Sequence, residues 1–324
     1  MLIVQKFGGS SLVDGERLRH VAELCLAARR REAELVLVVS AMGDATDRLS
    51  RSAREMSPAP PKRELDALVT TGEQQAAALL VMAMEELGLR AVSLTGWQAG
   101  ILTDGTYGAG EIRLVAPGRI REELSRGRIP VVTGFQGICA RGDVTSLGRG
   151  GSDTTAVALA AALEADACEI YTDVDGVYTA DPRRLPEARK LNTVDFRDML
   201  ALAKAGAKVL HPKSVELAMA NRVPLRLLSS FTEGEGSALC LLPERARPRF
   251  AGLTFSDGCL TLAGKGADAG ALSEAVLLLA REGIRVEEGA LAENALTLSV
   301  EPEEQARAAA LVHEHFVLAQ FGED

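Results

Sequence analysis

Aromatic residues, cysteines and long apolar runs are all scarce in this sequence of 324 residues. Only 4% of the residues are aromatic, and Trp97 is the single tryptophan. No apolar run approaches the roughly 20 residues that a membrane-spanning helix needs. The apolar start at residues 1–4 is too short for a signal-peptide core, because Lys6 follows it so soon. We therefore expect a soluble, cytoplasmic protein with no membrane partner.

The five cysteines are odd in number and widely scattered. This pattern fits neither a disulfide framework nor a zinc site, so we expect no metal held by protein ligands. We interpret the cysteines as small core residues, namely Cys25, Cys139, Cys168, Cys240 and Cys259. The formal net charge of −9 argues against a nucleic-acid partner, although it leaves room for a local basic pocket that binds a polyanion.

The first three quarters of the chain alternate between apolar strands and amphipathic helices, which is typical of βαβ units. The pattern predicts strands at 2–7, 35–39, 91–95, 129–135, 168–172 and 224–228. It predicts helices at 14–31, 63–87, 195–205 and 212–221, and a glycine-punctuated hairpin or excursion at 96–113. We therefore expect an α/β domain over residues 1–243, with a mainly parallel open sheet sandwiched by helices.

A proline-bounded linker at 243–248 precedes a second domain at 249–324. The pattern there predicts strands at 260–263, 285–290, 295–300 and 317–321, and helices at 271–282 and 303–315. That order, βαββαβ, is ferredoxin-like.

A glycine-rich loop at 145–155 leads into a run of small helix-forming residues. Free N–H groups and the positive end of a helix dipole make such a loop a seat for an anion. Arg149 adds a planar guanidinium that matches a carboxylate or a phosphate. The alternative is an ordinary strand-to-helix turn with a charged rim.

Two lysines suit phosphate binding. Lys6 stands beside Gly8-Gly9-Ser10 at the carboxyl end of the first strand, where open α/β sheets bind ligands. Lys208 opens a later helix, although by itself it is more typical of a surface residue. The sequence contains neither a P-loop nor a Gly-x-Gly-x-x-Gly after the first strand. Phosphoryl transfer fits nonetheless, because it asks mainly for positioned cations and N–H donors.

The stretch from Thr172 to Arg183 suits a nucleotide, because it offers hydroxyl, carboxylate, ring and guanidinium groups; a turn rich in Asp and Gly is the alternative. Glu73 lies among small apolar residues and fits either a buried or a surface role. His211 is interpreted as a cap or packing residue, and the other three histidines receive no catalytic role.

Seven motifs in order resemble the aspartate kinases of the amino-acid kinase superfamily, over residues 1 to about 235. The motifs are Lys6-Phe7-Gly8-Gly9-Ser10-Ser11, Val39-Ser40-Ala41-Met42-Gly43, Thr71-Gly72-Glu73, Gly134-Phe135-Gln136-Gly137, 147–153, 172–183 and 208–212. The resemblance implies the amino-acid kinase fold and ATP-dependent phosphorylation of the side-chain carboxylate of L-aspartate, with Mg²⁺ bound to the nucleotide. The product would be 4-phospho-L-aspartate, on the route to lysine, methionine and threonine.

The resemblance also implies roles for individual residues. Catalytic roles fall on Lys6, Asp153 and Lys208. ATP-binding roles fall on Lys6, Phe7, Gly8, Gly9, Ser10, Thr172, Asp173, Tyr178, Arg183, Lys208 and Val209. Aspartate-binding roles fall on Ser40, Thr46, Glu73, Phe135, Arg149 and Ser152.

The C-terminal part departs from the family pattern of two tandem ACT modules, since it has room for only one. Residues 265–271 also lack the Asp-x-Pro-Gly turn that commonly binds the effector. The resemblance therefore leaves feedback inhibition by lysine or threonine open, and implies a homodimer or a higher homo-oligomer formed through the ACT-like module. The alternatives are a kinase for another small acid, a carbamate or a nucleotide, and a non-catalytic amino-acid-binding regulator.

Overall fold

The computed structural model describes residues 1–321, which form two compact units. The first unit contains residues 1–175 and 220–235, and the second contains 176–219 and the chain from 236 onward. The chain therefore leaves the first unit at residue 176, returns to it at residue 220 and leaves it again at residue 236. The predicted division into a catalytic domain at 1–243 and an ACT-like domain at 249–324 stays a prediction about which residues carry which function. Among the described residues, no helix combines the length and apolarity needed to cross a membrane.

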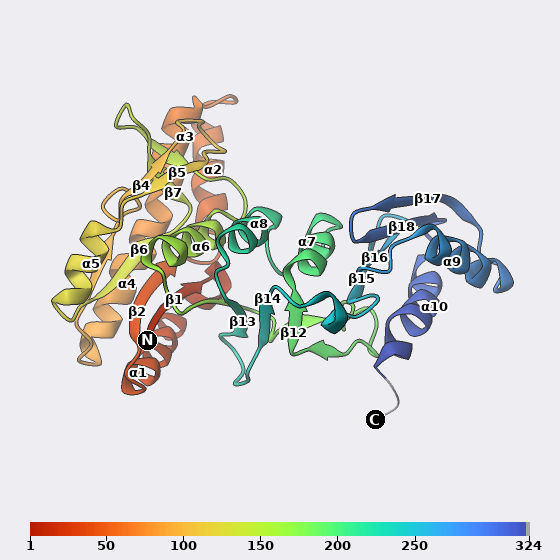
Figure 1. Ribbon diagram of the computed structural model, residues 1–324. Coiled ribbons are helices and arrows are strands. Elements are labelled where there is room, and N and C mark those ends of the chain that lie inside the picture. The colour runs from red at the N-terminus through yellow and green to blue at the C-terminus, as the bar shows by residue number, and fades with distance from the viewer. Residues whose placement is uncertain (322–324) are drawn as a thin grey trace. The chain divides into compact units, whose positions relative to one another are not determined.

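The first unit contains six parallel strands around β1 (Figure 1). In spatial order they are β13 (Leu225–Ser229), β9 (Ala167–Thr172), β1 (Leu2–Phe7), β2 (Glu34–Val39), β6 (Ile129–Thr133) and β3 (Ala91–Leu94). Phe7 lies level with Val39 on one side and Tyr171 on the other. The strand order reverses direction at β1, so the carboxyl end of β1 is where such sheets bind ligands.

Helices bury both faces of this sheet. Ile3, Phe7 and Val39 point to the face where α1 (Gly15–Arg30) and α4 (Thr71–Glu86) pack. Val4, Val36 and Val38 alternate with them and are also fully buried, and α6 (Gly151–Leu163) packs against β1. Burial on both faces is why these strands are continuous apolar runs. The predicted parallel α/β sheet sandwiched by helices is confirmed.

A second, four-stranded sheet completes the first unit. Its order is β5 (Ile112–Val115), β4 (Ile101–Thr103), β7 (Gln136–Ile138) and β8 (Val144–Ser146). The β4–β5 pair is the predicted hairpin. The buried carboxylate of Asp66 ties the helix α3 (Lys62–Val69) to β8, because it accepts hydrogen bonds from the N–H and hydroxyl of Ser146 at 2.9 and 2.7 Å. The other elements are η1 (Gly9–Leu12), α2 (Ala45–Met56) and α5 (Gly118–Ser125).

The second unit contains a four-stranded antiparallel sheet and two helices that cover it. The strand order is β15 (Gly252–Ser256), β16 (Cys259–Ala263), β18 (Ala295–Val300) and β17 (Val286–Ala292), and the helices are α9 (Ala269–Arg281) and α10 (Gln305–Phe316). The remaining elements are β10 (Val177–Tyr178), β11 (Lys190–Leu191), β12 (Thr193–Asp195), α7 (Phe196–Lys204), α8 (Pro212–Asn221), β14 (Ser237–Cys240), η2 (Glu244–Ala246) and η3 (Leu318–Gln320). This arrangement agrees with the predicted ACT-like domain of sheet and helices.

Several predicted elements were wrong in detail. The predicted helix at 63–87 is two helices that meet at Thr70, whose hydroxyl bonds the carbonyl of Asp66 and closes α3. The predicted strand at 317–321 is η3 instead, because the side chain of Gln320 occupies both the N–H and the carbonyl of Phe250. The strand β15 and the helix α2 were not predicted.

The cysteines only partly match the expectation of core residues. Cys25, Cys139 and Cys168 are buried, whereas Cys240 is half-buried and Cys259 is exposed.

Candidate active site

The carboxyl ends of the parallel strands gather most of the predicted residues of the first unit. Lys6 and Phe7 end β1, Ser40 follows β2, and Gly134 and Phe135 follow β6. Thr172 ends β9 and Asp173 follows it, with the Thr172 hydroxyl 3.0 Å from Oδ1 of Asp173. Adjacent parallel strands end at the same sheet edge, so residues distant in sequence converge there.

The ion pair between Lys6 and Asp153 marks the middle of this edge. Nζ of Lys6 lies 2.6 Å from Oδ1 of Asp153, and the two side chains are only 11% and 14% exposed. Asp153 lies in the first turn of α6, where the helix dipole favours a negative charge. Gly150 caps that turn in the left-handed conformation at φ 70°, which a glycine adopts without strain. The glycine-rich loop therefore presents an acid to the lysine of β1.

Two glycines allow close approaches of the main chain just after β1. A Cβ on Gly9 would lie 2.8 Å from the carbonyl oxygen of Ala41, so the position requires glycine. A Cβ on Gly8 would lie 3.5 Å from Nζ of Lys6, so its absence leaves space beside the ammonium. Ser10 is exposed at this turn. The ring of Phe7 is fully buried and stacks on Tyr171 at 4.7 Å, so only its main chain can face a ligand.

Glu73 supplies a second buried carboxylate in the first turn of α4. It is 3% exposed, and Oε1 accepts a hydrogen bond of 3.2 Å from the N–H of Ala41. Its Oε2 has no hydrogen-bond partner among residues 1–321. Burial raises the pKa of Glu73 to about 7, because removal from water disfavours the charged form. A cationic group at Oε2 would compensate that cost, so the site suits an ammonium.

Arg149 is exposed just before α6, and its guanidinium makes no hydrogen bond or ion pair with the described part of the chain. It is therefore available to a ligand.

The remaining predicted substrate residues lie around the same edge. Phe135 has φ 67°, and its N–H donates to Oγ1 of Thr155 while its carbonyl accepts from Leu147. Ser152 packs on Gly134, where a Cβ would lie 2.7 Å from the serine Oγ. Ser40 and Thr46 are half-buried, Thr46 in the first turn of α2.

The second unit holds the other predicted nucleotide residues. Arg183 is exposed, and its guanidinium makes two bonds of 3.0 Å to the carboxylate of Asp181. Tyr178 is half-buried in β10. Lys208 is exposed, and Val209 is half-buried, in the turn before α8. No described contact decides whether these residues act on one nucleotide, so their roles stay predictions.

Comparison with known proteins identifies the family, since residues 1–229 match the model described as the amino acid kinase family. The chain belongs to the amino acid kinase family. It is 55% identical over 237 residues to the aspartokinase of Mycolicibacterium smegmatis, which covers 73% of this chain and 56% of that protein. The chain thus matches little more than half the length of such curated relatives.

The fold of the chain is also similar to those of solved aspartate kinases. The aspartate kinase from Synechocystis is 31% identical with a TM-score of 0.69, covering 98% of this chain and 69% of that one. E. coli aspartokinase III, solved with aspartate and ADP, is 26% identical with a TM-score of 0.71, covering 94% and 80%.

The sequence analysis missed two groups at this sheet edge. Ala41 contributes only main-chain atoms, since its N–H bonds Glu73 and its carbonyl faces Gly9, and side-chain chemistry gives no signal for such a role. Thr133 ends β6, is buried, and has an Oγ1 without a partner among the described residues. A hydroxyl at the end of an apolar strand, just before Gly134, was the available signal.

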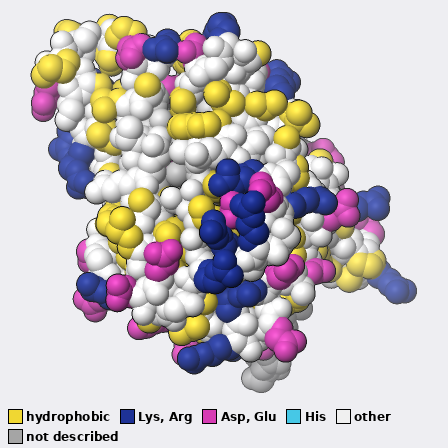
Figure 2. All heavy atoms as spheres, turned by 90° about the vertical axis from the view of Figure 1, so that its left-hand side faces the viewer, with side chains coloured by type: hydrophobic (Ala, Val, Ile, Leu, Met, Phe, Trp, Pro, Cys, Tyr) yellow, Lys and Arg dark blue, Asp and Glu magenta, His cyan; other side chains and the backbone are white. Residues whose placement is uncertain are grey.

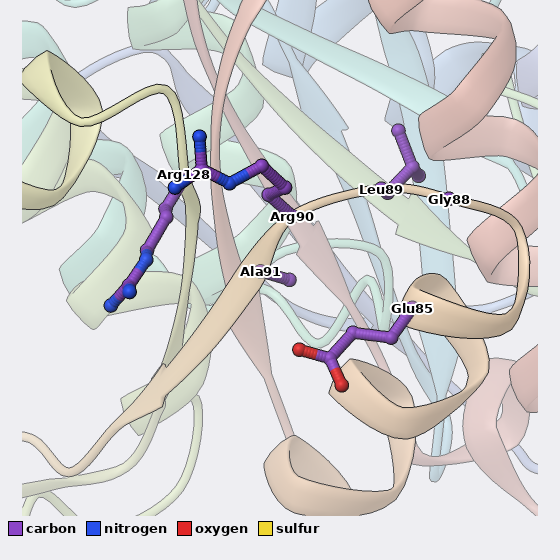
Figure 3. Close-up of a pocket in the computed structure, with 6 residues that line it drawn as sticks. All are labelled: Glu85, Gly88, Leu89, Arg90, Ala91 and Arg128. Carbon is purple, nitrogen blue, oxygen red and sulfur yellow. The ribbon is translucent and has the colours of Figure 1, made fainter.

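A cavity of about 450 Å³ lies elsewhere in the first unit, between α4 and the start of β3 (Figure 3). Arg90 and Arg128 lie side by side there, with Glu85 across from them. These residues precede β3 and β6, so the cavity is at the amino ends of the strands, opposite the predicted site.

Basic side chains also gather on one face of the molecule (Figure 2). On and after α5, Arg119, Arg126 and Arg128 surround the buried carboxylate of Glu123. None of them was predicted as a site residue.

Proposed function

We propose that this protein is an ATP-dependent phosphotransferase that converts L-aspartate to 4-phospho-L-aspartate. The observation that carries the proposal is the pair of buried charged groups at one sheet edge: Lys6, held by Asp153, and Glu73, with a free oxygen. The first suits a transferring phosphoryl group and the second an α-ammonium. The names of the relatives support the substrate, as does the presence of aspartate and ADP in the E. coli structure.

The phosphate end of the proposed site is formed by Lys6, Gly8, Gly9 and Ser10, with Phe7 contributing main chain. Lys6 would stabilise the charge that develops on the transferring group, because its ammonium is held in place before the reaction. Asp153 fixes that ammonium at 2.6 Å and so orients it. Thr172 and Asp173 from β9, and Tyr178, Arg183, Lys208 and Val209 from the second unit, are the proposed contacts to the rest of ATP.

The amino-acid end is formed by Arg149, Glu73 and four flanking residues, Ser40, Thr46, Phe135 and Ser152. The planar guanidinium of Arg149 can bind both oxygens of the α-carboxylate, and the carboxylate of Glu73 can form an ion pair with the α-ammonium. The nucleophile is the side-chain carboxylate, which is already ionised near neutral pH and needs no general base. Catalysis then depends on holding that carboxylate in line with the γ-phosphorus.

Mg²⁺ is proposed to arrive with ATP. No group of three or more His, Cys, Asp or Glu within residues 1–321 is placed to hold a metal ion. Mg²⁺ is usually bound by one or two carboxylates together with substrate phosphates, so a protein cage is not required. Asp153 and Asp173 are the carboxylates at the phosphate end. When bound, the metal supplies charge neutralisation on the phosphates.

We also propose a cytoplasmic homodimer or higher homo-oligomer, formed through the ACT-like sheet. The edge strand β17 supports this, because six of its seven residues are exposed in the single chain. An exposed edge is a template for pairing with another strand. Sedimentation measurements test the assembly. The aspartyl phosphate would serve lysine, methionine and threonine biosynthesis.

An ADP-release assay with ATP, Mg²⁺ and a panel of acids tests the proposed activity. We expect turnover with L-aspartate well above that with glutamate, acetate or a nucleoside monophosphate. Preference for another acid would favour the alternative kinase. Binding of aspartate without ADP release would favour the non-catalytic regulator, for which two lysines aimed at phosphate have no use.

A further inference from the structure

The nucleotide segment, defined here as residues 177–191, is a hairpin built by β10 and β11. Val177 pairs with Leu191 and Tyr178 with Lys190. The hydroxyl of Ser237 closes its base, since Oγ accepts the N–H of Val177 at 2.8 Å and donates to the carbonyl of Leu191 at 2.5 Å. The segment carries Tyr178 and Arg183, two of the proposed ATP contacts.

Thr179 is the point where this hairpin joins the C-terminal sheet. It is fully buried; its N–H bonds the carbonyl of Arg189, and its Oγ1 accepts the N–H of Arg189, both at 2.9 Å. Its carbonyl accepts the N–H of Leu253 in β15 at 2.7 Å. A Cβ on Gly252 would lie 2.8 Å from that carbonyl oxygen. The main chain of β15 therefore approaches Thr179 so closely that residue 252 has no room for a side chain.

His313 on α10 completes the polar groups around Thr179. The imidazole is 1% exposed, and Nε2 lies 2.9 Å from Oγ1 of Thr179. Because a hydroxyl donates one hydrogen bond and accepts up to two, Oγ1 of Thr179 can bond Nε2 of His313 while it also accepts the N–H of Arg189. Burial lowers the pKa of His313, and the nearby Glu187 opposes this only in part. The neutral ring is therefore the form that the fold favours.

The tip of the segment is anchored in the same module. Ala180 and Leu185 belong to the apolar core that contains Phe250 and Phe316. The guanidinium of Arg184 lies 3.8 Å over the ring of Phe255, and its Nη1 donates to the Phe255 carbonyl at 2.5 Å. The segment between these anchors is thus part of the C-terminal module by packing, although it precedes that module by some 60 residues in sequence.

We propose that His313 is a positioning residue for nucleotide binding, acting through Thr179 to hold the segment that carries Tyr178 and Arg183. The inference rests on the proposed function. It assigns the C-terminal module a direct part in ATP affinity, with no effector required. Aspartate affinity should not depend on this bond, because the proposed aspartate contacts lie in the first unit.

Steady-state kinetics on His313→Ala test the proposal. We expect the KM for ATP to rise about three- to tenfold, the range for a lost buried hydrogen bond. The kcat and the KM for aspartate should stay within about twofold of wild type. Thr179→Val should show the same split with a larger rise, because it also removes the bond from the N–H of Arg189. Adding His313→Ala to Thr179→Val should change little more, because the bond between the two side chains is already lost. Thr179→Ser keeps the hydroxyl and His313→Gln keeps an acceptor, so both should recover most of the ATP affinity.

The matched control is His315→Ala on the same helix, which removes an exposed imidazole bonded to Glu274 at 2.8 Å. It should leave both KM values unchanged. An unchanged KM for ATP in His313→Ala, or equal rises in both KM values, would overturn the proposal. If His313→Ala does not fold, Thr179→Val and His313→Gln give the same comparison.

Hydrogen exchange separates this inference from the proposed activity. Amides of 177–191 should exchange faster in His313→Ala than in His315→Ala, whatever the substrate is. Equal exchange in the two variants would contradict the anchoring. Faster exchange in a protein that releases no ADP with aspartate would instead fault the proposed function alone.

Discussion

The ammonium of Lys6 lies 2.6 Å from the carboxylate of Asp153, and this pair joins the end of β1 to the first turn of α6. Both side chains are largely removed from water, so their attraction offsets part of the cost of burying each charge. The ion pair fixes the position of the Lys6 ammonium beside Gly8. A phosphate that binds there can form an ionic contact with this ammonium. This is the arrangement expected of a group that acts on a transition state.

Replacement of Lys6 by alanine should abolish most turnover. We expect kcat to fall by at least about 10²-fold, because a preorganised cation is lost, while the KM for aspartate stays within about threefold. Steady-state kinetics with saturating ATP measure both. Lys62→Ala, an exposed lysine at the start of α3, is the matched control and should be fully active. A Lys6→Ala variant with wild-type kcat would remove Lys6 from the mechanism.

Replacement of Arg149 by alanine should act mainly on substrate binding. A charge-assisted contact to the α-carboxylate contributes enough that the KM for aspartate should rise roughly 10- to 100-fold. The KM for ATP should change little. The control is Arg54→Ala, since Arg54 on the helix α2 is also exposed and makes no hydrogen bond or ion pair within residues 1–321. An unchanged aspartate KM would place Arg149 outside the substrate site.

The raised pKa of Glu73 should appear in the pH profile. Only the ionised form answers an ammonium, so kcat/KM for aspartate should fall as the pH drops below about 7, the pKa of Glu73 in the free protein. The kcat at saturating aspartate should vary less, because the bound ammonium keeps Glu73 ionised. Glu73→Gln should lower kcat/KM and remove this ionisation. A profile that keeps the same ionisation in Glu73→Gln would assign it to another group.

The same carboxyl should make stability depend on pH. Its pKa is higher in the folded protein, about 7, than the ordinary value of 4.5, so the folded state binds the proton more tightly. Its contribution is therefore present at low pH and is lost as the pH rises from 4.5 to 7. Glu73→Gln should gain about 3 kcal/mol relative to wild type between pH 4 and pH 8. Denaturant titrations at the two pH values measure the gain, and no change would contradict the raised pKa.

A buried ion pair should dominate the stability of the second unit. The Arg247 guanidinium bonds the buried carboxylate of Asp198 and approaches Asp195 at 3.8 Å. Arg247→Ala leaves Asp198 without its ion-pair partner, whereas Asp195 keeps Arg197, and the change should cost about 3–5 kcal/mol in the free energy of unfolding. Arg245→Ala, exposed two residues earlier, should cost less than about 0.5 kcal/mol. Equal free energies of unfolding for the two variants would show that the ion pair of Arg247 contributes little to stability.

The sequence predicted the parallel strands well because their signal is local. The run Leu35 to Val39 is buried on both faces, and an unbroken apolar run rich in valine and leucine is typical of such a strand. Lys6 was identified from its place at the end of the first strand, whereas the site role of Ser40 came from the resemblance. Asp153 and Glu73 were identified only by the resemblance, although the structure places each in the first turn of a helix.

Long-range contacts explain most of what the sequence analysis missed. The stretch 317–321 has the apolar content of a strand, yet Gln320 bonds the main chain of Phe250, which no local pattern reveals. Thr179 and His313 are 134 residues apart, and neither position signals the other. The break at Thr70 depends on a side-chain bond to Asp66 that propensity alone does not predict.

The most direct test is to trap the product of ATP, Mg²⁺ and L-aspartate with hydroxylamine and identify it by mass spectrometry. The account predicts the hydroxamate of the side-chain carboxyl, formed in an amount equal to the ADP released and absent with Lys6→Ala. A hydroxamate of the α-carboxyl, or ADP release without any aspartyl hydroxamate, would contradict it.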